Sequence, residues 1–232
     1  MGSLNRHQKQ SQLRGLLISI EGIDGAGKST IAGQLERKFI AEGYPVQLVR
    51  EPGGTIISER IRELLLDPGN QQIAAKTEAL LYAAARAQLV AEVIQPNLEA
   101  GQLVICDRYT DSTLAYQGGG RGIDLEWLRD LNRLATGGVQ PEVTLLLDLD
   151  PQIGRNRRST RQGSGRPGED RLEAESEAFY HRVRETYLQV AREEPQRLRV
   201  VDASKPLPEV VEEAWEILAQ SLNRKTNCAV LT

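Results

Sequence analysis

The residues whose types and spacing most clearly indicate chemistry stand in the segment EGIDGAGKST, at positions 21–30. It contains G-x-x-x-x-G-K-S, the pattern of a loop that holds nucleotide phosphates between backbone N–H groups. In such a loop Lys28 is expected to reach the β- and γ-phosphates of ATP, and the Ser29 hydroxyl to bind Mg²⁺. The candidate ATP-binding residues are Gly22, Ile23, Asp24, Gly25, Ala26, Gly27, Lys28, Ser29 and Thr30.

Asp24 is unexpected in the middle of this loop. An ionised carboxylate is repelled by phosphates unless it has a donor from which it can accept a hydrogen bond. Its presence is understandable if the side chain faces away from ATP, toward a sugar hydroxyl or a magnesium-bound water. A side chain turned into solvent is the alternative.

A second charged pair, Asp107 and Arg108, directly follows the apolar run LVIC at 103–106. A carboxylate at the carboxyl end of a strand beside a phosphate loop suits a water-mediated partner of Mg²⁺ or a group on the acceptor side. The arginine suits a second phosphate-bearing substrate, and a plain ion pair at the strand end is the alternative. The chain lacks the guanine-reading N-K-x-D of GTP-binding switch proteins.

These residues need elements that bring them together, and the apolar periodicity supplies such elements. Short apolar runs predict buried strands and longer amphipathic patterns predict helices between them, so the expected fold is α/β, a three-layer P-loop NTPase fold with a five-stranded parallel sheet flanked by helices. Strands are expected at 15–21, 46–49, 103–106, 143–149 and 198–201, and helices at 28–41, 56–66, 74–100, 125–135, 172–193 and 208–222.

Composition narrows the class of protein. The chain has 232 residues, 40% of them hydrophobic, and a formal net charge of −3, so a nucleic-acid partner is not expected. The apolar runs are shorter than a membrane span, and the two cysteines provide no disulfide framework, so we expect a cytoplasmic protein. We divide the chain into a flexible extension at 1–14, one domain at 15–222 and a tail at 223–232.

Five segments, in this order, resemble bacterial thymidylate kinases: EGIDGAGKST, REPGGT (50–55), LLYAAARAQ (80–88), DRYTDSTLAYQGGGRG (107–122) and DRLE (170–173). The resemblance covers roughly residues 15 to 220, and the long fourth segment is its most specific part. It implies transfer of the ATP γ-phosphoryl group to dTMP, giving dTDP for dTTP synthesis, by a homodimer that uses Mg²⁺.

The resemblance also implies roles for particular residues. At the Asp24 position the family binds the 3′-hydroxyl of the acceptor. An aromatic ring at Tyr82 stacks on thymine, Arg86 hydrogen-bonds the base, Arg108 holds the dTMP phosphate, and Tyr116 crowds the sugar 2′ position. The family more often has Phe where this chain has Tyr82. The candidate dTMP-binding residues are Asp24, Glu51, Pro52, Tyr82, Arg86, Arg108, Thr113, Tyr116 and Gln117.

The arginine-rich segment 155–171, RNRRSTRQGSGRPGEDR, is the candidate lid. Some thymidylate kinases carry an arginine inside the phosphate loop, but Gly25 stands there in this chain. The pattern resembles the bacterial subclass that supplies this arginine from a mobile lid. Of its arginines we favour Arg161 and Arg166, which together with Lys28, Asp107 and Arg108 are the candidate catalytic residues.

Three other interpretations stay open at this point. The lid segment could be a solvated basic loop or a contact for nucleic acid. The enzyme could phosphorylate another nucleoside monophosphate, although Tyr82, Arg86 and Tyr116 argue against it. The chain could also be a nucleotide-dependent regulatory protein that transfers no phosphate to a metabolite. ATP turnover that depends on an acceptor would separate the last two classes.

Overall fold

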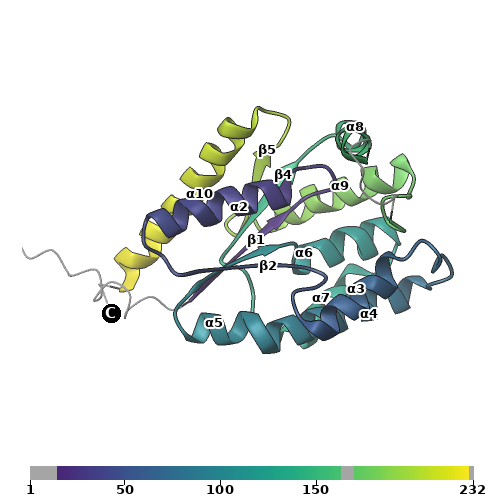
Figure 1. Cartoon of the computed structure of the whole chain (residues 1–232), viewed down its shortest axis with the longest axis horizontal. Helices are drawn as coiled ribbons and strands as arrows, with labels where there is room; N and C mark the ends of the chain where they lie inside the picture. The colour runs from purple at the N-terminus through teal and green to yellow at the C-terminus, as the bar shows by residue number, and fades with distance from the viewer. Residues whose placement is uncertain (1–14, 163–169, 230–232) are drawn as a thin grey trace, which may run out of the picture.

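The computed structural model describes residues 15–162 and 170–229, so the predicted extension at 1–14 lies outside the described part. Within these residues five parallel strands form one sheet, as expected (Figure 1). Their order in the sheet is β2-β3-β1-β4-β5. β1 lies in the middle, so the segment that follows it emerges at the centre of the sheet's carboxyl edge. The strands are β1 (Leu16–Glu21), β2 (Val46–Arg50), β3 (Leu103–Asp107), β4 (Val143–Asp148) and β5 (Leu198–Asp202).

Helices cover both faces of this sheet. α2 and α10 lie together on one side, and η1 and α5 on the other (Figure 1). The helical segments are α2 (Lys28–Ala41), α3 (Ile56–Leu66), α4 (Ala75–Leu89), η1 (Val90–Ile94), α5 (Gln95–Glu99), α6 (Thr110–Thr113), η2 (Leu114–Gly120), α7 (Leu125–Thr136), α8 (Pro151–Gln162), α9 (Glu177–Glu193) and α10 (Leu207–Ala229). In the described part of the chain, no helix combines the length and the apolar character needed to cross a bilayer.

Alternation along β1 explains the two cores. Ile18 and Ile20 belong to the larger apolar cluster that includes the inner side of α2, whereas Leu17 belongs to a second cluster with Val104 and Cys106. Successive side chains of a strand point to opposite faces, so an apolar run without polar interruptions is what a strand covered on both faces requires. Both clusters together hold the carboxyl ends of β1 and β3 side by side.

Several boundaries differ from the sequence-based expectation. The helix expected at 74–100 is interrupted by the π-helical turn η1, and the helix expected at 172–193 begins only at Glu177, because the Ser176 side chain caps it by accepting from the Phe179 N–H at 3.2 Å. α10 continues to Ala229, so the backbone of most of the predicted tail at 223–232 is helical.

The first part of the candidate lid is helical. Residues 155–162 belong to helix α8, which starts with Pro151, a residue suited to the first helical position. The mobility of the lid stays a prediction, and residues 163–169 lie outside the described part.

Candidate active site

The loop after β1 has the backbone conformation that phosphate binding needs. Gly22, Gly25 and Gly27 all have positive φ, at 137°, 88° and 93°, and Gly27 directly precedes α2. Lys28 lies over the loop and donates from Nζ to the Ile23 carbonyl at 2.9 Å. Burial, aided by the charge of Arg108, lowers the pKa of Lys28 to about 8, so the ammonium is still protonated at neutral pH.

A hydroxyl and a carboxylate meet beside this loop. Ser29 opens α2 and Asp107 ends β3, the strand paired with β1, and the Ser29 hydroxyl donates to Asp107 Oδ2 at 2.5 Å. Hydroxyl and carboxylate oxygens are the ligands that Mg²⁺ prefers, and Mg²⁺ in kinases is usually held by one or two such groups together with substrate phosphates. The pair therefore fits the metal that the sequence predicts.

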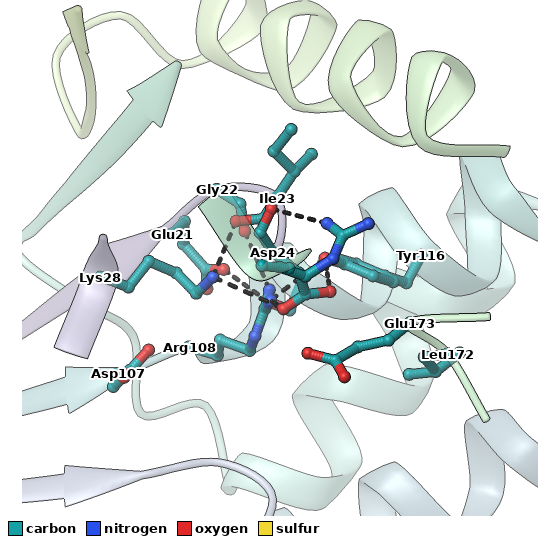
Figure 2. A network of polar contacts seen from close by, with 12 residues as sticks. Glu21, Gly22, Ile23, Asp24, Lys28, Asp107, Arg108, Tyr116, Leu172 and Glu173 are labelled. Carbon is teal, nitrogen blue, oxygen red and sulfur yellow. Dashed lines mark hydrogen bonds and ion pairs between the residues drawn. The ribbon is translucent and has the colours of Figure 1, made fainter. Parts of the chain in front are cut away.

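Asp24 does not point into solvent. Its carboxylate accepts from Arg108 Nη2 at 2.5 Å and from the Tyr116 hydroxyl at 2.8 Å, and Lys28 Nζ lies 3.9 Å away. Figure 2 shows this carboxylate at the centre of the polar network. Burial would raise its pKa, but the charges of Arg108 and Lys28 outweigh burial and hold the pKa of Asp24 well below its ordinary value. The cations explain how an ionised aspartate is tolerated in a phosphate loop.

Arg108 is held in an unusual backbone conformation. Its φ is 71°, which makes it the one non-glycine residue with positive φ among the described residues. Such backbone strain persists when surrounding contacts enforce it, and it is common at functional sites. Here the guanidinium donates to the Gly22 carbonyl at 3.0 Å and lies 4.9 Å from the centre of the Tyr116 ring.

Glu21 supports the turn that carries Arg108. This buried carboxylate accepts from the Tyr109 N–H and from the Ser112 hydroxyl, both at 2.6 Å. Burial and the nearby charge of Asp111 raise the pKa of Glu21 to about 7. β1 thus fixes the backbone on both sides of Arg108.

Helix α8 lies directly against the phosphate loop. A Cβ at Gly25 would lie 2.3 Å from the Gly154 carbonyl oxygen, so this close contact between the loop and the helix leaves no room for a side chain at position 25. Four residues after Gly154, Arg158 Nη1 donates to the Asp24 carbonyl at 2.9 Å, and its guanidinium stacks 4.7 Å from the Tyr180 ring centre. This arginine is almost fully buried, at 6% exposure.

One pocket opens from this network toward α3 and α4, and it contains every residue predicted for the dTMP site. Its lining residues are Asp24, Glu51, Pro52, Arg62, Leu66, Tyr82, Arg86, Arg108, Ser112, Thr113, Tyr116, Gln117, Asp170 and Leu172. Arg62, Leu66, Ser112, Asp170 and Leu172 are those that sequence reasoning did not include. Asp170 and Leu172 lie in the DRLE motif, which was the available signal for them.

Arg86 lies at the far end of this pocket with nearly all of its donors in use. Nε donates to Glu51 Oε2 at 2.7 Å, and Nη1 donates to the hydroxyl of Thr113 at 2.9 Å. Nη1 also donates to the side-chain oxygen of Asn132 at 2.7 Å, and Nη2 donates to the Tyr109 carbonyl at 3.0 Å. A guanidinium has five N–H groups, so within the described residues one N–H remains available on Nη2.

The chain is similar to known thymidylate kinases in sequence and in structure. A family model described as thymidylate kinase matches residues 20–214. A thymidylate kinase from Syntrophotalea carbinolica is 49% identical over 207 residues, covering 89% of this chain and 96% of the relative, and one from Deinococcus radiodurans is 48% identical, covering 89% and 98%. The crystal structure of a thymidylate kinase from Ehrlichia chaffeensis superposes with a TM-score of 0.71 at 32% identity, covering 88% of this chain and 98% of that chain.

The chain belongs to the thymidylate kinase family. The resemblance inferred from the five sequence motifs is thereby confirmed, as is the P-loop α/β fold. The matched region, residues 20–214, lies within the range that the motifs had indicated.

Membership in the thymidylate kinase family draws attention to the lid arginines. The side chain of Arg161 and all of Arg166 lie outside the described part of the structure, so these two predictions stay untested. Among the lid arginines with described side chains, Arg158 is the one that contacts the phosphate loop, whereas Arg157 donates to the Ala203 carbonyl at 3.1 Å. Sequence spacing alone gave no reason to prefer Arg158 to its neighbours.

Proposed function

We propose that this member of the thymidylate kinase family transfers the γ-phosphoryl group of ATP to dTMP, with the residues described above in the following roles. One observation supports this most strongly: Asp24 and Arg108 belong both to the polar network of the phosphate loop and to the lining of the pocket beside it. A donor nucleotide on the loop and an acceptor in the pocket would therefore meet at these two residues.

The loop and its cations would stabilise the transferring group. Lys28 would leave the Ile23 carbonyl and bind the β- and γ-phosphates, while Arg108 binds the phosphate of dTMP. Arg158, with Arg161 and Arg166 as further candidates, would neutralise charge that develops on the transferred phosphoryl oxygens. The attacking oxygen of dTMP is already anionic at neutral pH, so positioning and charge stabilisation suffice without a strong general base.

Asp24 and Tyr116 would recognise the sugar of dTMP. The Asp24 carboxylate is ionised and has acceptor capacity beyond its contacts with Arg108 and Tyr116, so it can accept a hydrogen bond from the 3′-hydroxyl. The Tyr116 ring packs edge-on against Phe179, Tyr180 and Tyr187, which fixes its position. A ring fixed in this way would exclude a 2′-hydroxyl by steric contact.

The far end of the pocket would recognise the base. Thymine presents an acceptor at O4 beside a donor at N3–H, and its ring offers a face on which Tyr82 can stack. The free N–H of Arg86 suits O4, and an amide oxygen of Gln117 suits N3–H. Glu51, Pro52 and Thr113 would hold this end of the pocket in shape.

Ser29 and Asp107 would hold Mg²⁺ together with the ATP phosphates, Asp107 directly or through water. When bound, the metal would supply positive charge that offsets the negative charge of the ATP phosphates. We also propose a homodimer and a cytoplasmic location, which stay predictions from the sequence and the family.

An assay of ADP formation tests the proposal. The protein is mixed with ATP and Mg²⁺ and with one acceptor at a time: dTMP, dUMP, the ribonucleotide analogue of dTMP, dCMP, dGMP or AMP. We expect fast ADP formation with dTMP and little without an acceptor. ATP hydrolysis that ignores the acceptor would favour a regulatory nucleotide-binding protein, and preference for another acceptor would refute the roles given to Tyr82, Arg86 and Tyr116.

A further inference from the structure

Glu78 is a fully buried carboxylate that the mechanism above does not use. It lies on α4, and three side chains contact its carboxylate: Gln117, Arg121 and Arg171. Gln117 donates from Nε2 to Glu78 Oε1 at 2.9 Å. Arg121 donates from Nε and Nη2 to the two carboxylate oxygens, both at 3.1 Å, and Arg171 Nη2 forms an ion pair at 2.7 Å.

These contacts keep Glu78 ionised. Burial opposes the charge, but the hydrogen bonds from Arg121 and Gln117 and the charges of Arg121 and Arg171 outweigh burial and hold the pKa of Glu78 below its ordinary value. An ionised carboxylate accepts hydrogen bonds and cannot donate them. The amide group of Gln117 that faces Glu78 must therefore be the NH₂ group.

This constraint determines what Gln117 offers on its other side. A side-chain amide has one donor end and one acceptor end, so fixing the NH₂ on Glu78 leaves the oxygen as the end that can face the pocket, which Gln117 lines. The backbone is held as well, because the Gln117 carbonyl accepts from the Ile123 N–H at 3.1 Å. Without Glu78, rotation of the amide by half a turn would present a donor instead.

We propose that Glu78 is a positioning residue for base specificity: it fixes the amide of Gln117 so that the pocket accepts a pyrimidine with a hydrogen on N3 and rejects cytosine. Thymine and uracil carry N3–H, which the amide oxygen can accept. Cytosine has a bare acceptor at N3, which would face that oxygen without a hydrogen between them. This inference rests on the proposed function of the pocket as the dTMP site.

A purely structural role makes a different prediction. Glu78 also joins Arg121 and Arg171, and Arg121 in turn pairs with Glu175 at 2.5 Å. If Glu78 served only to hold these segments together, its loss would lower activity with every acceptor by the same factor. If Glu78 acts through Gln117, its loss should instead change the ratio of kcat/KM for dTMP to kcat/KM for dCMP.

The test compares kcat/KM for dTMP and dCMP in Glu78→Gln, Glu78→Asp and Glu175→Gln. Glu78→Gln removes the constraint on the amide, and Glu78→Asp keeps the charge but shortens the side chain by one methylene group. Glu175→Gln is the matched control, because it alters a carboxylate on the same arginine without a contact to Gln117. We expect Glu78→Gln to lower the dTMP-to-dCMP ratio by at least about tenfold, the effect of one lost hydrogen bond to a buried polar group.

A double-mutant cycle with Gln117→Leu shows whether the effect runs through the amide. We expect Glu78→Gln to leave the ratio unchanged in the Gln117→Leu background. If Glu78→Gln does not fold, Glu78→Asp provides the test. We expect Glu78→Asp to lower the dTMP-to-dCMP ratio by an intermediate factor, and we expect no such change in the Gln117→Leu background.

An unchanged ratio in a folded Glu78 variant, or the same change in Glu175→Gln, would overturn the inference while leaving the proposed function intact. Failure of the unaltered protein to use dTMP would refute the proposed function itself. The two failures are therefore distinguishable in one set of assays.

Discussion

At the scale of single residues, Asp24 carries the most information about this site. Its contacts with Arg108, Tyr116 and Lys28 turn a charge that should repel ATP into one that is compensated from three directions. The sequence indicated that the residue needed a hydrogen-bond donor, and the structure shows that Arg108 is such a donor and that Lys28 lies nearby. The hydroxyl of Tyr116 could not be placed from the sequence, because it comes from a π-helical segment with no recognisable local pattern.

The substitution Asp24→Asn tests the proposed contact with the 3′-hydroxyl. Loss of the carboxylate should weaken a charge-assisted hydrogen bond by about 1.5 to 3 kcal/mol, so the preference for dTMP over its 3′-deoxy analogue should fall by about tenfold or more. The measurement is kcat/KM for both acceptors. Equal losses for the two acceptors would show that Asp24 acts only by orienting Arg108.

The raised pKa of Glu51 predicts that the free energy of unfolding depends on pH. Burial raises its pKa from an ordinary 4.5 to about 7, although the charge of Arg86 opposes the rise. The folded state therefore binds a proton more tightly than the unfolded state, and stability is lost as the pH rises from about 4.5 to about 7. Glu51 alone accounts for a fall of about 3 kcal/mol over this range.

The measurement is urea unfolding at several pH values, and Glu51→Gln should show a weaker decline in the free energy of unfolding than the unaltered protein. Glu21 contributes in the same direction, since its pKa is also raised to about 7, so some decline should remain in the variant. An identical slope in both proteins would mean that Glu51 titrates normally.

At the scale of elements, the contact between the phosphate loop and α8 is the basis for proposing Arg158 as the arginine that reaches the transferring group. Gly25 and Gly154 allow the two backbones to meet, and one turn later α8 presents Arg158 to the loop. A loop with an arginine at the position of Gly25 would not leave room for this approach. In this geometry an arginine at position 25 of the loop and an arginine supplied by α8 therefore exclude each other for steric reasons.

Arg158→Ala should therefore lower kcat by about 10³-fold, within the range measured for arginines that stabilise phosphoryl transfer. Arg157→Ala is the control, because Arg157 lies on the same helix and bonds the Ala203 carbonyl instead. Steady-state kinetics with saturating ATP and dTMP would measure both. A larger loss in Arg157→Ala, or in Arg161→Ala, would move the role to another position of the helix.

The strands could be predicted because burial on both faces of the sheet leaves continuous apolar runs. The longer helices could be predicted from their amphipathic patterns. The helices at 28–41 and 56–66 agree with α2 and α3 residue for residue. The start of α9 was missed because Leu172 continues the apolar pattern into a turn, where the cap at Ser176 rather than periodicity sets the boundary. The π-helical segment η2 was missed because glycines at 118–120 are typical of a turn.

At the scale of the whole molecule, exposed apolar side chains gather on three neighbouring helices. α4 packs against both α3 and α7 (Figure 1). All three helices expose large apolar residues to solvent. They are Ile56, Ile57, Leu64, Leu80, Trp127 and Leu134. Exposed apolar side chains on neighbouring helices are typical of protein interfaces, so we expect the predicted homodimer to form through these helices.

Light scattering during gel filtration tests this expectation. The unaltered protein should have twice the chain mass of 25.7 kDa, and the combined substitutions Leu80→Asp and Leu134→Asp should shift it toward the single chain. Ile40→Asp is the control, because Ile40 is similarly exposed but lies on α2. A single-chain mass for the unaltered protein would refute the homodimer, and an effect of Ile40→Asp alone would place the interface elsewhere.

The central claim is that the pocket beside the phosphate loop selects dTMP as the phosphoryl acceptor. A competition assay tests it most directly: limiting ATP and Mg²⁺ are added to an equimolar mixture of dTMP, dUMP, dCMP, dGMP and AMP, and the diphosphates formed are identified by mass spectrometry. The ratio of products gives the ratio of kcat/KM values in a single reaction. We predict that dTDP dominates. A dominant diphosphate other than dTDP, or none above a control without protein, would contradict the account.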